Sequence, residues 1–92
     1  MSTPPAGYSI EITRPAARDL RRLDRPIRMR VLDALERLTA PRPAGDVRAL
    51  TGHPGQYRLR VGDWRVRYKL NSDHQQLIVL RVLPRGRAYR DT

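Results

Sequence analysis

The sequence of 92 residues contains no cysteine. Disulfide bonds and thiolate metal sites are therefore excluded, and a reducing cytoplasm is the expected location. Histidine is also scarce. Only His53 and His74 occur, and neither has a second histidine at i,i+4 or a nearby acidic cluster to complete a metal shell. We expect no metal ion and no other cofactor.

Long hydrophobic runs are also missing from the sequence. No stretch approaches the roughly 20 apolar residues needed to span a bilayer. Residues 1–7 lack the apolar run of a signal peptide. We therefore expect a soluble, intracellular protein that does not associate with membranes. A chain of this length supports one small core, so we predict a flexible lead over residues 1–7 and a single domain over residues 8–92.

Acidic residues are few, with 9 Asp and Glu against 19 Lys and Arg, which gives a formal net charge of +10. Lysine contributes almost nothing to this excess, since Lys69 is the only one. Such a charge density on a small domain predicts an acidic partner, either nucleic acid or an acidic protein, and salt-dependent binding to it.

The most informative stretch covers residues 57–70, where apolar and basic residues alternate on both sides of Gly62-Asp63. This pattern predicts two half-buried strands joined by a two-residue turn. The apolar face carries Tyr57, Leu59, Val61, Trp64, Val66, Tyr68 and Leu70, and the basic face carries Arg58, Arg60, Arg65, Arg67 and Lys69. If Val61 pairs with Trp64, the turn places arginines directly opposite one another, Arg60 against Arg65 and Arg58 against Arg67.

Like charges that face each other across two strands are destabilising, and no acidic residue of the hairpin lies on this face. Two interpretations follow: an ordinary solvated face, or an anion site whose ligand supplies the missing negative charge. We favour the anion site, because the planar arginine fork donates paired hydrogen bonds to phosphate and stays protonated.

The flanking segments complete the expected fold. Alternation over residues 8–13 predicts a first strand, and helical spacing predicts two helices, from about residue 15 to 23 and from about residue 25 to 39. Residues 77–83 are apolar on both faces, as expected of a central strand, except for Arg81. By simple alternation Arg81 shares a face with Leu77, Val79 and Leu83.

Thr13 and Asp24 are the expected helix caps, and each precedes a proline in the first turn. The predicted order is strand, helix, helix, strand, strand, strand. This order indicates an α+β fold with a four-stranded, mostly antiparallel sheet and an N-terminal helical hairpin packed on one face. The helices would cover the apolar face of the sheet and leave the arginine face open.

Three motifs resemble the RelE-like branch of the RelE/ParE superfamily of bacterial toxins. They are Ala49-Leu50-Thr51-Gly52, the hairpin string over residues 57–68, and Arg85 placed four residues before Tyr89. The resemblance spans residues 8–90. It implies a toxin that enters the ribosomal A site, cleaves mRNA and is held inactive in a hetero-oligomer with a cognate acidic antitoxin.

The resemblance also implies which residues act. The family's catalytic positions fall on Arg58, Arg60, Arg65, Arg85 and Tyr89. Contacts to the RNA backbone are expected from Arg67, Lys69, Arg87 and Arg90. Arginines would stabilise the charge that develops when a 2′-hydroxyl attacks the adjacent phosphorus, and Tyr89 would orient that hydroxyl or stack on a base.

One departure from the family bears on the mechanism. Ribonuclease members often carry lysines on the first hairpin strand, whereas arginines stand at positions 58 and 60 here, and guanidinium is not deprotonated in proteins. The general base is then Tyr89 or a ribosomal group. Alternatively there is no general base, and catalysis depends on electrostatic stabilisation alone. Two other functions stay open: a ParE-like inhibitor of DNA gyrase, and a catalytically inactive member that binds only RNA or its antitoxin.

Overall fold

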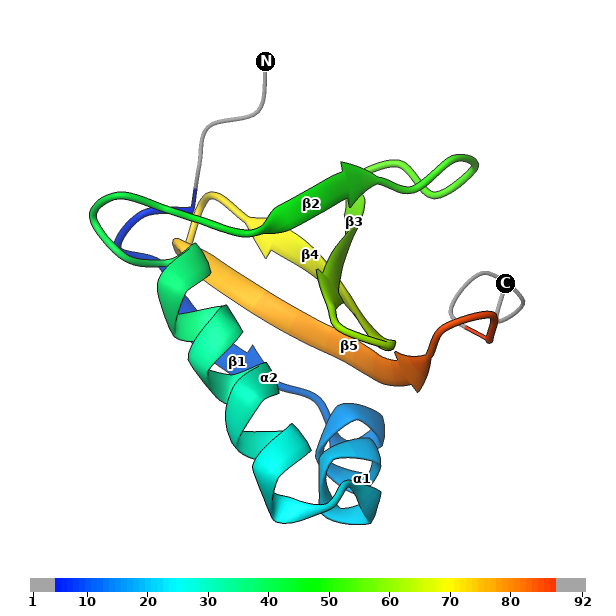
Figure 1. Ribbon diagram of the computed structural model, residues 1–92. Helices are drawn as coiled ribbons and strands as arrows, with labels where there is room; N and C mark the ends of the chain where they lie inside the picture. The colour runs from blue at the N-terminus through cyan, green and yellow to red at the C-terminus, as the bar shows by residue number, and fades with distance from the viewer. Residues whose placement is uncertain (1–4, 88–92) are drawn as a thin grey trace.

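The computed structural model describes residues 5–87, which form a sheet with two helices packed against one of its faces (Figure 1). The elements are β1 (Ser9–Ile12), α1 (Arg14–Arg22), α2 (Arg25–Leu38), β2 (Asp46–Ala49), β3 (Gln56–Val61), β4 (Trp64–Asn71) and β5 (Gln76–Pro84). The expected α+β class and the N-terminal helical hairpin are therefore confirmed.

The sheet has five strands in the order β1-β5-β4-β3-β2, so the expectation of four strands was wrong by one. β1 pairs with β5 in parallel, and the other neighbours are antiparallel. β5 has a partner on each side, which confirms the prediction of a central strand for the apolar run near the C-terminus. The two sheet edges are β1 and β2.

The additional strand is β2, which pairs with β3. Its sequence, Asp46-Val47-Arg48-Ala49, has one large apolar side chain and follows a proline-rich stretch, so periodicity gave no strand signal. As an edge strand it is short and charged, as edge strands that resist aggregation usually are. β2 adds a charged row to the sheet beside the hairpin.

The helix starts follow the local sequence. Thr13 Oγ1 accepts a hydrogen bond from the Ala16 amide at 3.4 Å, as expected of a cap, and also donates to the Val79 carbonyl oxygen at 2.8 Å. This second bond ties the start of α1 to β5. Asp24 occupies the expected cap position of α2, but its side chain makes no capping hydrogen bond.

The core lies between the helices and the apolar face of the hairpin. Leu59, Val66 and Tyr68 of that face are buried, and they pack in one cluster with helical residues such as Val31 and Leu35. The expected division of the hairpin into an apolar and a basic face is thus confirmed. Between residues 5 and 87, neither helix has the length and apolar character needed to cross a membrane.

A bulge in the pairing of β4 with β5 changes the predicted face of Arg81. Tyr68 pairs with Val79, but the next residue back, Arg67, pairs with Arg81, so Leu80 is an extra residue. One extra residue moves everything beyond it to the opposite face. Arg81 therefore does not share a face with Leu77 and Val79. Its side chain reaches α1, where it pairs with Asp19.

Candidate anion site on the β3–β4 hairpin

The predicted hairpin register is confirmed. Val61 pairs with Trp64 across the turn, and the turn glycine, Gly62, has φ of +58°, a conformation that glycine adopts readily. In consequence Arg60 stands directly opposite Arg65. The next pair on the same face is Arg58 opposite Arg67. Four guanidinium side chains therefore project from one face of two adjacent strands.

The face is less open than expected. Only 6% of Arg58, 7% of Arg65 and 6% of Arg67 is exposed to solvent, whereas the Arg60 side chain is 56% exposed. The expectation of an open arginine surface was therefore wrong for three of the four. Alternation determines which face a side chain takes, but long stems packed side by side also shield one another from water. Burial strengthens the field of each charge, because less water screens it.

Uncharged acceptors hold two of these arginines in place. Arg65 Nη1 donates to the carbonyl oxygens of Gly62 at 2.8 Å and Trp64 at 2.9 Å. Arg67 Nη2 donates to Oε1 of Gln56 at 3.0 Å. A neutral acceptor fixes the direction of a guanidinium without cancelling its charge. The hairpin therefore positions Arg65 and keeps its positive charge available.

Arg58 lies on β3, an inner strand of the sheet. Its Nε atom is buried and has no hydrogen-bond partner in residues 5–87. A buried donor without an acceptor costs about 1–3 kcal/mol, and such groups in native proteins usually have a functional reason. An anion that docks against Arg58 would satisfy both this donor and the charge.

The edge strand β2 adds two residues to this face that the sequence analysis missed. Arg48 pairs with Arg58, so Arg48, Arg58 and Arg67 form a row across three strands. Asp46 pairs with Arg60, and its Oδ2 lies 3.9 Å from Arg60 Nη1. An acidic residue therefore does reach the face, from outside the hairpin. This long, exposed ion pair is weak, so Arg60 remains available.

The other predicted site residues are arranged around the hairpin. Lys69 lies at its open end and is exposed, opposite Gln56. Arg85 and Arg87 follow β5 and are exposed, and the Arg85 amide donates to the Asp63 carbonyl oxygen at 2.8 Å, which brings this segment to the hairpin turn. The remaining two predicted residues, Tyr89 and Arg90, lie outside the described part of the chain.

The two tyrosines of the hairpin pack in or against the core. The rings of Tyr57 and Tyr68 stack with centroids 5.5 Å apart. Burial raises the pKa of Tyr68 well above the usual value for tyrosine, with a smaller contribution from Tyr57, so Tyr68 stays neutral at physiological pH. Tyr68 is therefore not a candidate general base.

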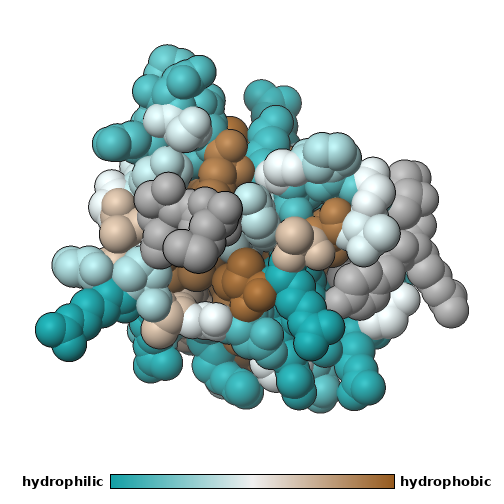
Figure 2. Space-filling model, turned by 90° about the horizontal axis from the view of Figure 1, so that it is seen from above, coloured by the Kyte–Doolittle hydropathy of each residue, from teal (hydrophilic) through white to brown (hydrophobic). Residues whose placement is uncertain are grey.

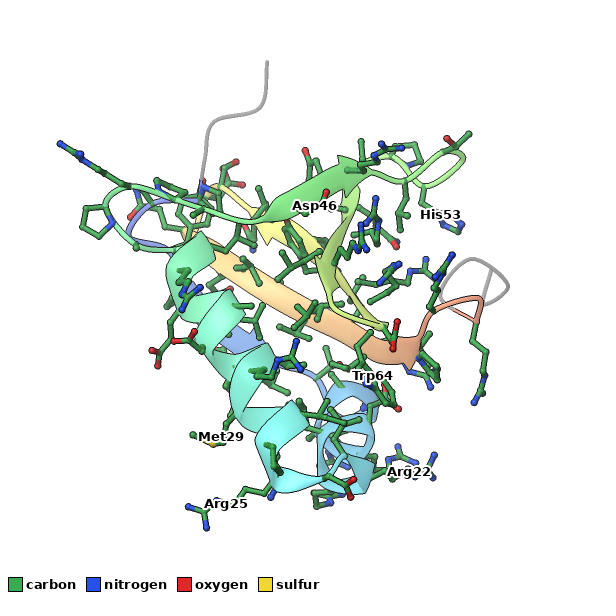
Figure 3. The ribbon with its side chains drawn as sticks, viewed as in Figure 1. Arg22, Arg25, Met29, Asp46, His53 and Trp64 are labelled. Atoms are coloured by element: carbon green, nitrogen blue, oxygen red, sulfur yellow. The ribbon has the colours of Figure 1, made fainter. Side chains whose placement is uncertain are left out.

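The surface around the site is mainly hydrophilic. Seen from the side on which β2 lies, hydrophilic side chains project along much of the rim, and hydrophobic residues appear between them in separate patches (Figure 2). Figure 3 shows Asp46 on β2 and His53 in the loop that follows β2. Between residues 5 and 87, no three His, Asp or Glu side chains are grouped so that they could hold a metal ion.

Comparisons with known proteins agree with this architecture. A family model described as the ParE toxin of the type II toxin–antitoxin system parDE matches residues 10–89. No curated protein sequence matches the chain. Among solved structures, the archaeal RelE–RelB complex from Pyrococcus horikoshii contains a chain with 31% identity and a TM-score of 0.72, with 88% of this chain and 98% of that chain covered.

Two bacterial structures are also similar. The toxin–antitoxin complex RelBE2 from Mycobacterium tuberculosis has 25% identity and a TM-score of 0.69, over 88% of this chain and 94% of that one. The isolated Escherichia coli RelE toxin shares the fold, with 23% identity and a TM-score of 0.68 over 86% of this chain and 85% of that one. The family match extends over most of the chain, and the fold is that of the RelE toxins. The chain therefore belongs to the ParE toxin family of type II toxin–antitoxin systems, within the RelE/ParE superfamily.

Proposed function

We propose that this toxin is a metal-independent endoribonuclease that cleaves mRNA in the ribosomal A site and so inhibits translation. The observation that supports this most is the arginine cluster on β3 and β4. Arg58 has a buried donor without an acceptor, and Arg65 is held by neutral carbonyl groups. Such a cluster suits a ligand that carries several negatively charged oxygens close together, as a phosphodiester does when it is attacked.

In this proposal the 2′-hydroxyl of one nucleotide attacks the adjacent phosphorus in line, and the 5′-oxygen of the next nucleotide leaves. Arg58 and Arg65 bind the phosphate oxygens, Arg60 lies near the nucleophile, and Arg85 stabilises the leaving oxygen. Each well-placed donor in such a site contributes about 2.7–4 kcal/mol, or roughly 10²–10³ in rate. Tyr89 orients the hydroxyl or stacks on a base. The proton acceptor is Tyr89 or a ribosomal group, because a guanidinium cannot take this role.

The same proposal includes a protein partner in the cytoplasm. The toxins of the solved complexes are bound to RelB antitoxins, and we infer that this chain is likewise held in a hetero-oligomer by an acidic antitoxin. Acidic residues of that partner would lie on or beside the arginine cluster. The complex should then dissociate more easily as ionic strength rises.

A second candidate function is ParE-like inhibition of DNA gyrase, which the match to a ParE toxin family model leaves open. An inhibitor that only binds gyrase needs no catalytic cluster. The buried, directed arginines of the hairpin are therefore the feature that separates the two candidates. The third candidate is a catalytically inactive member of the family that binds only RNA or its antitoxin.

The test is a primer-extension map of transcripts in a translating extract, with gyrase supercoiling measured in parallel. The proposal predicts ribosome-dependent cuts that Arg65→Ala reduces by roughly 10²-fold or more, that Tyr89→Phe also reduces, and that the control Arg37→Ala leaves unchanged. Arg37 is exposed on α2, where it pairs with Asp33, and it does not belong to the hairpin. Intact transcripts together with inhibited supercoiling would support the gyrase function instead.

A further inference from the structure

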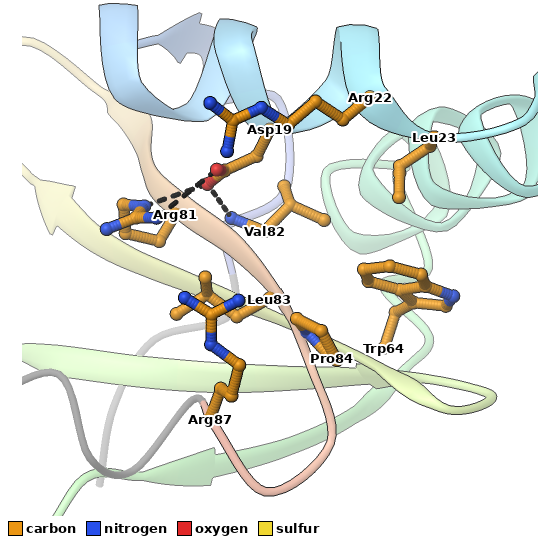
Figure 4. A pocket seen from close by; sticks show the side chains of 9 residues that line it. All are labelled: Asp19, Arg22, Leu23, Trp64, Arg81, Val82, Leu83, Pro84 and Arg87. Atoms are coloured by element: carbon orange, nitrogen blue, oxygen red, sulfur yellow. Dashed lines mark hydrogen bonds and ion pairs between the residues drawn. The ribbon is translucent and has the colours of Figure 1, made fainter.

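A second cationic feature lies where α1 runs along the end of β5. Two hollows of about 230 Å³ and about 130 Å³ adjoin there, and they share Asp19, Arg22 and Arg81. The larger also includes Arg18, and the smaller includes Trp64 and Arg87 (Figure 4). We call this continuous hollow, lined by Arg18, Asp19, Arg22, Arg81, Arg87 and Trp64, the edge groove.

The charges of the edge groove are unbalanced. Among residues 5–87, its lining brings four guanidinium groups together with a single carboxylate, Asp19. That carboxylate is already engaged, because it accepts hydrogen bonds from Arg81 at 2.8 and 3.2 Å and from the Val82 amide at 2.9 Å. Arg18 and Arg22 are exposed and have no ion pair among residues 5–87. The groove therefore presents a strong local positive potential.

The groove is also continuous with the anion site on the hairpin. Leu83, which lines the groove, pairs with Arg65, and Pro84, which also lines it, pairs with Trp64. The groove thus begins beside the turn end of the hairpin. A nucleic acid strand held on the arginine cluster would meet the groove as it leaves around the end of β5.

We propose that the edge groove binds a phosphodiester group of the RNA strand next to the one at which the toxin cuts. This inference rests on the proposed function and extends it from the cleaved phosphate to a flanking one. An arginine fork can bind two phosphate oxygens at once. Each hollow has several times the volume of roughly 30 Å³ that one water occupies in the liquid. The indole of Trp64 lines the groove beside these cations, which suits a nucleotide better than a bare ion.

An acidic protein segment is the competing occupant, and the surface argues against it. Protein partners anchor through apolar side chains in a central contact. The large apolar residues exposed on the described surface are Ile12 and Met29, and neither lines the groove. Figure 3 shows Met29 on the outer side of α2, away from the groove. The smaller hollow has an apolar wall that includes Leu23 and Leu83, whereas the larger hollow is lined almost entirely by charged side chains, which matches a phosphate backbone.

The experiment measures binding of a labelled 2′-O-methyl RNA, which cannot be cut by its own 2′-oxygen, to the full-length toxin over a range of salt concentrations. The groove variant is Arg18→Gln with Arg22→Gln. The control is Arg21→Gln with Arg25→Gln, which removes the same charge from exposed positions of the same helical hairpin outside the groove. Arg65→Gln serves as the hairpin-site variant.

The proposal predicts that the groove variant binds roughly tenfold more weakly at low salt and that the slope of log K against log salt falls by about 0.7 for each phosphate that the variant no longer neutralises. The control should stay within about twofold of the wild type. If the groove variant binds like the control while Arg65→Gln binds weakly, the groove inference is wrong and the proposed function stands. If the wild type fails to bind RNA, the groove inference is wrong, and the transcript map in translating extract decides the proposed function separately. Tighter binding of a glutamate-rich peptide than of RNA, abolished in the groove variant, would identify a peptide site and overturn the inference.

Discussion

Replacing Arg58 with methionine should stabilise the fold and abolish activity. Arg58 is buried between Arg48 and Arg67 in the cross-strand register, and its Nε has no acceptor within residues 5–87. At an effective dielectric constant of about 20, two like charges about 4 Å apart repel by about 4 kcal/mol, and the repulsion falls in inverse proportion to their separation. Methionine keeps most of the length of the side chain and removes both the charge and the orphan donor. Replacing buried ionic groups by apolar ones of similar size is often neutral or stabilising by about 1–4 kcal/mol.

Repulsion from Arg48 and Arg67 and the unsatisfied Nε donor both destabilise the wild type, so the variant should be more stable. Screening by salt and repulsion in the charged unfolded chain reduce this gain in stability. We expect Arg58→Met to raise the free energy of unfolding by about 1–2 kcal/mol, which for a domain of this size corresponds to a rise in Tm of roughly 5–15 °C. The gain should shrink as salt is added, because salt already weakens the repulsion in the wild type. Transcript cleavage should be abolished.

The assay is urea unfolding of the full-length toxin at low and high ionic strength, with Arg37→Met as the charge-matched control. Arg37 is exposed and lies 2.9 Å from Asp33, so its replacement should destabilise the fold by about 0.3–0.5 kcal/mol. A destabilisation of more than about 1 kcal/mol in Arg58→Met, at both ionic strengths, would mean that Arg58 is a structural residue and would refute this reasoning.

Three further predictions concern the framework of the site. Asp19→Ala should destabilise the fold by about 3 kcal/mol in chemical unfolding, because it removes the carboxylate that accepts hydrogen bonds from Arg81 and from the Val82 amide, whereas Asp19→Asn should cost less. Gly62→Ala should cost about 1 kcal/mol in the same assay, because φ at this turn position is +58°. Since burial raises the pKa of Tyr68, its hydroxyl should stay protonated in the native protein as pH passes 10.0, its ordinary pKa. The free energy of unfolding should then be unaffected by this group below that pH and should fall above it, where the unfolded chain ionises. A Tyr68→Phe variant should lack this part of the decline.

The register of the hairpin was predictable because two independent signals agreed on it. Strict alternation assigned each side chain to a face, and a two-residue turn left one way to pair Arg58 with Arg67. The helix boundaries were predictable for similar reasons, since Thr13 and the following proline mark a start that periodicity then supports.

Features that depend on the third dimension were not predictable. β2 contains one large apolar residue, and its pairing with β3 decides that Arg48 joins the arginine row. The bulge at Leu80 has no sequence signal, and it alone moves Arg81 off the face of Leu77. Alternation also gives no information about how deeply a side chain is buried. Arg65 was therefore expected on an open surface, whereas the structure buries it. In each case the missing information is an interaction with a distant strand or helix.

The central claim is that the arginines of the hairpin stabilise a phosphate under attack by the neighbouring 2′-hydroxyl. The most direct test is to load ribosomes with an mRNA that carries a single 2′-deoxynucleotide at the mapped cut and to compare its cleavage with that of the all-ribose transcript. We expect the wild type to cut the all-ribose transcript, Arg65→Ala to cut it far more slowly, and the deoxy transcript to stay intact. Cleavage of both transcripts at the same rate, or of neither, would contradict it.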